Sequence, residues 1–125
     1  MKKILLVEDD PFLIDVYSTK FKESGFDFEV ANDGEQGLKK LSEKKFDLLL
    51  LDIVLPQIDG WQILEKIKAL ETSLGHLRLL KIIILSNLSQ REDVEKGIGL
   101  GATKYLIKAH YTPSEVVAEI EQLLK

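Results

Sequence analysis

The chain has 125 residues, of which 45% are hydrophobic and 30% are charged, and its formal net charge is −4. This length and composition are typical of one globular domain, so we expect a single domain over residues 1–125. The acidic balance argues against direct binding to nucleic acid, which requires clustered Lys and Arg. Because the chain has no cysteine, any metal would be bound by oxygen or His.

The start of the chain does not look like an export signal. Lys2 and Lys3 are followed by only four apolar residues, Ile4 to Val7, and acidic residues come next. No apolar stretch approaches the roughly twenty residues that a membrane-spanning helix needs. We therefore expect a cytoplasmic protein that does not contact a membrane.

Short apolar runs alternate along the chain with longer amphipathic segments. The runs predict strands at residues 4–7, 28–31, 48–51, 82–85 and 105–107, and the longer segments predict helices at residues 12–21, 34–41, 61–70, 94–100 and 116–124. Five strand-helix units in alternation predict a doubly wound α/β fold, in which helices cover both faces of a parallel sheet.

The composition of the runs predicts which strands are central. Residues 4–7, 48–51 and 82–85 are apolar at every position, as is typical of strands buried on both faces. The second run contains Glu29, and the fifth is short and flanked by lysines, which favours the edges of the sheet. The expected strand order is 2-1-3-4-5.

Polar residues and glycines mark the expected helix boundaries. Gly25, Gly75 and Gly101 follow predicted helices, where a residue without a Cβ can take the left-handed conformation. The pairs that predict helix starts are Asp10 with Pro11, Asp59 with Gln62, Ser89 with Glu92, and Thr112 with Pro113 and Glu115.

Chemically active side chains follow the predicted strands. In an open parallel sheet, ligands bind beyond the carboxyl ends of the strands, next to the point where the strand order reverses. That point lies here between the first and third strands, so we expect the residues after the strands to converge there. They are Glu8, Asp9 and Asp10 after the first strand, Asp52 after the third, Ser86 after the fourth and Lys108 after the fifth.

This set of side chains suits phosphoryl transfer. Clustered carboxylates repel one another, so they must take up protons or hold a cation, and oxygen ligands favour Mg²⁺. We expect Asp9 and Asp52 to be direct ligands of the metal. Lys108 and Ser86 can bind phosphoryl oxygens, and Asp52 is the candidate nucleophile.

Several motifs occur in order along nearly the whole chain: residues 4–10 (ILLVEDD), 47–56 (DLLLLDIVLP), Asp59-Gly60, Ser86, and residues 101–108 (GATKYLIK). Together they resemble the response-regulator receiver domains of the CheY-like family in two-component signalling. The resemblance implies a flavodoxin-like (βα)₅ sandwich. It also implies that the protein is not a turnover enzyme on an external substrate, although such domains promote their own phosphorylation and dephosphorylation.

The resemblance assigns roles to individual residues. It implies that Asp52 is the phosphoacceptor and that Mg²⁺ is bound by Asp9, Asp52 and the backbone carbonyl of Val54, with Glu8 acting through water. It implies that Ser86 and Lys108 contact the oxygens of the phosphoryl group. Ser86 and Tyr105 would form the switch. The phosphoryl group would draw the Ser86 hydroxyl inward, and the Tyr105 ring would follow it.

The resemblance also implies partners. A histidine kinase, a phosphotransfer protein or a small phosphodonor would supply the phosphoryl group to Asp52. The switch would alter the face made by the fourth helix, the fifth strand and the fifth helix, which would bind a downstream protein. Because the chain ends directly after the last predicted helix, at Lys125, we expect its output to pass through a partner.

Four positions depart from the family pattern. Ala109 replaces the proline that usually follows a cis bond in such domains, and we expect a trans Lys108–Ala109 bond because a non-proline cis bond is costly. Asn87 replaces a small residue. Val54 and Leu88 are apolar beside the expected path of attacking water, which predicts slow self-dephosphorylation. The segment 71–80 is longer than usual.

Three other functions compete with this interpretation. A haloacid-dehalogenase-like phosphatase needs a second Asp two residues after the nucleophile, where this chain has Val54. A flavin carrier of the same fold cradles phosphate in its first loop, where Glu8, Asp9 and Asp10 would repel it. A pseudo-receiver that acts only as a protein-binding module stays open because of Asn87 and Ala109.

Overall fold

Five parallel strands form one sheet in the computed structural model, which describes residues 1–125. Their order is β2-β1-β3-β4-β5, which confirms the predicted order and the two predicted edges. The strands are β1 (Lys3–Val7), β2 (Asp27–Ala31), β3 (Leu48–Leu51), β4 (Lys81–Ser86) and β5 (Lys104–Ile107).

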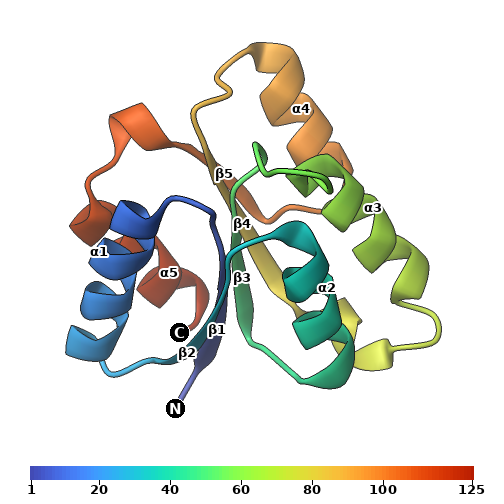
Figure 1. Ribbon diagram of the computed structural model, residues 1–125, viewed down its shortest axis with the longest axis horizontal. Coiled ribbons are helices and arrows are strands. Elements are labelled where there is room, and N and C mark those ends of the chain that lie inside the picture. Colours follow the sequence, from blue (N-terminus) through green and yellow to red (C-terminus); the bar gives the residue numbers. More distant parts are fainter.

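Five α-helices cover the sheet in two layers. Figure 1 shows α1 and α5 on one face and α2, α3 and α4 on the other. No helix has the length and apolar character needed to cross a membrane. The helices are α1 (Pro11–Glu23), α2 (Gly34–Glu43), α3 (Gly60–Leu70), α4 (Arg91–Gly99) and α5 (Pro113–Leu123), with short 3₁₀ helices at η1 (Gly75–Leu79) and η2 (Lys108–His110).

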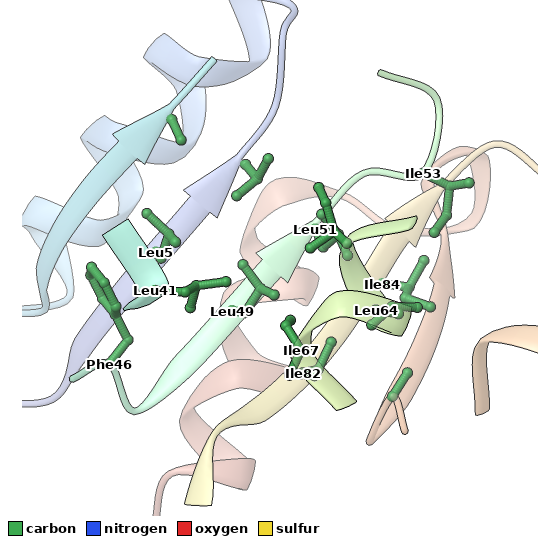
Figure 2. Close-up of a cluster of buried hydrophobic side chains, with 14 of the residues drawn as sticks. Leu5, Leu41, Phe46, Leu49, Leu51, Ile53, Leu64, Ile67, Ile82 and Ile84 are labelled. Atoms are coloured by element: carbon green, nitrogen blue, oxygen red, sulfur yellow. The ribbon is translucent and has the colours of Figure 1, made fainter. Parts of the chain in front are cut away.

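The leucines of β3 show why the central strands contain unbroken apolar runs. Leu49 and Leu51 belong to the core under α2, α3 and α4, part of which Figure 2 shows. Leu48 and Leu50 belong to the second core, under α1 and α5. Successive strand residues point to opposite faces, so a strand covered on both sides needs apolar residues throughout. Asp52 is therefore the first polar residue after a fully buried strand.

Helix α4 starts one residue later than predicted. The capping boxes at Asp59 and Thr112 are present as expected, whereas the predicted start at Ser89 is wrong. Gln90 is the cap residue, and the Asp93 carboxylate accepts a hydrogen bond from its backbone N–H at 3.2 Å. Asp93 thus provides the same three-residue spacing one position further along, and this pair forms instead of the Ser89 pair.

The expectation for helix-ending glycines holds at two of three positions. Gly25 and Gly101 have φ values of 79° and 110°, whereas Gly75 has no positive φ and begins η1. Residues of η1 explain why the chain does not simply turn at Gly75. Leu77 is buried in the core, and His76 Nε2 lies 3.0 Å from the carbonyl oxygen of Leu41 in the last turn of α2. The long segment therefore packs against α2.

Edge strand β2 carries a partly exposed charge cluster around Glu29. Its carboxylate forms ion pairs with Lys3 at 2.9 Å, Lys40 at 2.8 Å and Lys44 at 2.8 Å. Hydrogen bonds from these lysines lower the pKa of Glu29 to about 2. Glu29 thus links the start of β1 and the helix α2 to the edge of the sheet.

We expect Glu29→Gln to lower the free energy of unfolding at pH 7 by about 1–2 kcal/mol, because it leaves three lysines without their shared partner. A carboxyl whose pKa falls on folding stabilises the protein above its unfolded pKa of 4.5 and loses that contribution as the pH falls through about 2. The gap between variant and wild type should therefore shrink in urea unfolding between pH 5 and pH 2. Glu43→Gln, an exposed change on α2, is the control; an equal effect of the two changes would contradict this role of Glu29.

Candidate functional site

Two acidic residues extend neighbouring strands at the carboxyl edge of the sheet. The N–H of Glu8 donates to the carbonyl of Ala31 at 3.1 Å, and the N–H of Asp52 donates to the carbonyl of Val7 at 3.1 Å. These bonds continue the strand pairing past the ends of β1 and β3. Both side chains are almost fully buried, with exposed fractions of 3% for Glu8 and 6% for Asp52.

Three carboxylates and one ammonium group meet at this edge. One ligand oxygen each from Glu8, Asp9 and Asp52 lies within 4.8 Å of the others. Lys108 Nζ, from η2, donates to Glu8 Oε1 at 2.9 Å and to Asp52 Oδ2 at 3.0 Å. The structure thus brings together four of the residues that the sequence predicts for the site.

Backbone N–H groups bind the remaining oxygens of the buried acids. Glu8 Oε2 accepts from the N–H groups of Asp9 at 3.1 Å and Asp10 at 3.2 Å. Asp52 Oδ1 accepts from the N–H of Val54 at 3.3 Å. Each buried carboxylate therefore binds Lys108 with one oxygen and the backbone with the other.

The electrostatics of the cluster leave a surplus of negative charge. Burial raises the pKa of Glu8, and the nearby Asp52 adds to this shift while Lys108 opposes it. Burial disfavours the charge on Lys108, but hydrogen bonds to Glu8 and Asp52 outweigh this and raise its pKa. Three ionised carboxylates and one ammonium sum to −2. That charge and the all-oxygen donor set fit a divalent cation.

Ser86 and Tyr105 lie around the loop that follows β4. Ser86 is fully buried, and its Oγ accepts from the N–H of Leu88 at 3.2 Å. The half-buried Tyr105 donates its hydroxyl to the carbonyl of Leu88 at 2.6 Å. Burial and the carboxylate of Asp93 raise the pKa of Tyr105. Leu88 therefore joins the two predicted switch residues through its backbone.

The other predicted positions lie at the rim of the site. Asp10 is outside the carboxylate cluster and caps α1, since its side chain accepts from the N–H of Phe12 at 2.9 Å. The Lys108–Ala109 bond is trans, as expected. The side chains of Val54 and Asn87 are exposed.

Two contacts at the site were not predicted from the sequence. The direct bond from Lys108 to Glu8 was missed, although continuing the strand alternation past Val7 and Leu51 places Glu8 and Asp52 on the same face of the sheet. The Leu88 carbonyl was also missed, because a backbone acceptor in a loop leaves no signal in residue types.

Removal of Lys108 should destabilise the protein. We expect Lys108→Met to lower the free energy of unfolding at pH 7 by about 3 kcal/mol, because Glu8 and Asp52 stay buried without a counter-charge. The pKa of Glu8 should rise further above its usual 4.5. A carboxyl whose pKa rises on folding loses stability as the pH increases, so the defect should be smaller at pH 5 than at pH 7.

Urea unfolding at both pH values measures this effect. Lys104→Met, which removes the more exposed ion pair with Glu119, is the matched control and should cost no more than about 1 kcal/mol. An equal, pH-independent cost for the two variants would contradict the assigned electrostatics.

Known proteins are similar to this chain in sequence and in fold. The profile of the response regulator receiver domain matches residues 4–121. The transcriptional regulatory protein PcoR of Escherichia coli is 37% identical over 125 residues, which are 100% of this chain and 52% of PcoR. The chain spans about half the length of the curated relatives it matches.

Solved structures agree. The receiver domain of the Francisella response regulator 1452 has a TM-score of 0.86 at 28% identity, with 98% of this chain and 96% of that chain covered. The BeF₃-activated receiver domain of DrrB, from Thermotoga maritima, has a TM-score of 0.84 at 30% identity, with 99% and 97% covered. The chain therefore belongs to the response regulator receiver domains of two-component signalling.

Proposed function

We propose that the chain accepts a phosphoryl group on Asp52 in a Mg²⁺-dependent reaction. The reaction takes place in the cytoplasm, and the donor is a histidine kinase or phosphotransfer protein, which presents a phosphohistidine, or a small phosphodonor. The observation that carries this proposal is the buried Asp52 carboxylate, which binds the Lys108 ammonium and lies close to two further carboxylates.

The chain's own residues account for the transfer. A carboxylate oxygen of Asp52 attacks phosphorus, the bond from phosphorus to the donor's nitrogen or oxygen breaks, and the leaving group takes the bond electrons and a proton from solvent. Lys108, already within 3.0 Å of Asp52, neutralises charge on the phosphoryl oxygens. Asp9, Asp52 and the Val54 carbonyl, with Glu8 through water, would hold Mg²⁺, which supplies further charge neutralisation.

We extend the proposal to the output. Phosphorylation replaces the single charge of the Asp52 carboxylate with the roughly 1.5 to 2 negative charges of a phosphoryl group, whose oxygens can accept a new hydrogen bond from the Ser86 hydroxyl. Ser86 and Tyr105 are joined through Leu88, so a change at Ser86 reaches the Tyr105 ring. The face of α4, β5 and α5 would then present a changed surface to a downstream protein. The product is the aspartyl phosphate itself, without turnover of an external substrate.

The relatives' names support this assignment in part. PcoR is named a transcriptional regulatory protein, and the DrrB receiver domain is described as activated by BeF₃, a phosphoryl mimic. Because this chain matches only about half of PcoR, we carry over the phosphorylation switch and leave the identity of the downstream protein open.

Asp52→Asn should abolish phosphorylation. Incubation with a small phosphodonor and Mg²⁺ should add the mass of one phosphoryl group to the wild type, and hydroxylamine should remove it, as expected of an acyl phosphate. Asp33→Asn is the control, because Asp33 lies at the same edge of the sheet, caps α2 and is outside the carboxylate cluster. A label that persists in Asp52→Asn would overturn the acceptor assignment. No label in the wild type would favour the pseudo-receiver.

Mg²⁺ should stabilise the wild type through the carboxylate cluster. At a concentration about 100 times its Kd, a ligand adds about 2.7 kcal/mol, which corresponds to a rise in Tm of roughly 5–10 °C for a domain of this size. Asp9→Asn should lose most of this rise in a thermal melt. The adjacent Asp10→Asn should retain it, because Asp10 lies outside the cluster and Asn also caps helices well. Equal Mg²⁺ responses of the two variants would contradict the proposed ligand set.

A further inference from the structure

Helix α3 starts directly against the backbone of Asp52 and Ile53, which begin the loop after β3, called here the phosphoacceptor loop. The N–H of Gly60 donates to the carbonyl of Ile53 at 2.8 Å. A Cβ at Gly60 would lie 2.7 Å from the carbonyl oxygen of Asp52 and 2.6 Å from the Cα of Ile53. Only glycine allows this approach. The next residue, Trp61, is therefore attached to a helix start that rests on Asp52 and Ile53.

Trp61 contacts the cationic side chain of Lys96 in α4. Lys96 Nζ lies 4.6 Å from the centroid of the Trp61 ring, within the range of a cation–π interaction. Lys96 forms no ion pair with an acidic residue. Helices α3 and α4 lie on the same face of the sheet (Figure 1), and the contact between Lys96 and Trp61 joins them.

The same turn of α4 touches Tyr105. A Cβ at Gly97 would lie 2.9 Å from Cδ2 of the Tyr105 ring and 2.6 Å from Cδ1 of Ile84. The α4 backbone therefore packs directly on the ring, without a side chain between them. Lys96 and Gly97 thus place one helical turn in contact with two aromatic residues, Trp61 from the phosphoacceptor side and Tyr105 from the predicted switch.

We infer that Lys96 and Trp61 are positioning residues that hold α4 against the start of α3 while Asp52 is unmodified. This contact forms a second connection between the phosphoacceptor loop and α4, separate from the connection through Ser86, Leu88 and Tyr105. The inference rests on the proposed function, because it concerns how α4 responds to the phosphoryl group.

The contact favours the position of α4 that this structure shows, in which Asp52 is unmodified and bound to Lys108. Any movement of α4 that follows Tyr105 must break or shift the Lys96–Trp61 contact. A change that removes it should therefore make the activated arrangement easier to reach. The usual strength of an exposed cation–π contact corresponds to a factor of about two to five in that equilibrium.

Beryllofluoride binding with saturating Mg²⁺ tests the inference in the full chain. Calorimetry should show that Lys96→Met binds beryllofluoride about two to five times more tightly than the wild type. Lys96→Arg, which keeps a cation for the ring, should bind like the wild type. Lys66→Met is the matched control, because it removes an exposed lysine of α3 that forms no ion pair and no cation–π contact.

Trp61 supplies a second readout, since it is the only tryptophan of the chain. Its emission should change when beryllofluoride binds the wild type or Lys96→Arg, and the change should be largely lost in Lys96→Met. Unchanged or weaker binding by Lys96→Met, or an emission change equal to that of the wild type, would overturn the inference while leaving the phosphoacceptor assignment intact. Failure of every protein, the wild type included, to bind beryllofluoride would instead overturn the proposed function and the inference with it.

Discussion

Lys108 is the one positive charge among three carboxylates at the carboxyl ends of β1 and β3, and the rest of the site depends on this imbalance. Two of the acids are buried, so their charges cannot be left to solvent. The single ammonium binds both buried acids but leaves a charge of −2 in the cluster. A site of this kind is suited to a divalent cation and to a phosphoryl group that brings its own charge with it.

Much of the fold could be predicted because burial on both faces leaves a clear pattern. The all-apolar runs at residues 4–7, 48–51 and 82–85, which lie in β1, β3 and β4, and the charge in β2 indicated the strand order. Polar residues at the strand ends indicated the edge where the site lies. Details that depend on local competition could not be predicted in this way. Gln90 and Asp93 offered the same cap spacing as Ser89 and Glu92, and Gly75 entered η1 because Leu77 and His76 pack against the core and α2.

The alternation of side chains across the sheet also separates the site into two parts. Glu8, Asp52 and Lys108 meet on one side, whereas Ser86 and Tyr105 meet at Leu88 near α4. The sequence predicted that Glu8, Asp52, Ser86 and Lys108 share one edge, but the division into two parts depends on backbone contacts that residue types do not reveal. Helix α4 lies next to the second part of the site. Its Gly97 packs on the Tyr105 ring, and its Lys96 lies beside Trp61.

In the proposed function, Asp52 and its cluster form a phosphoryl-binding site that requires Mg²⁺. Fluorine NMR of beryllofluoride is a direct test of this site, because the bound anion gives its own resonances. We expect bound resonances at one equivalent per chain, present only with Mg²⁺ and absent from Asp52→Asn. Bound resonances that form without Mg²⁺, or that persist unchanged in Asp52→Asn, would contradict it.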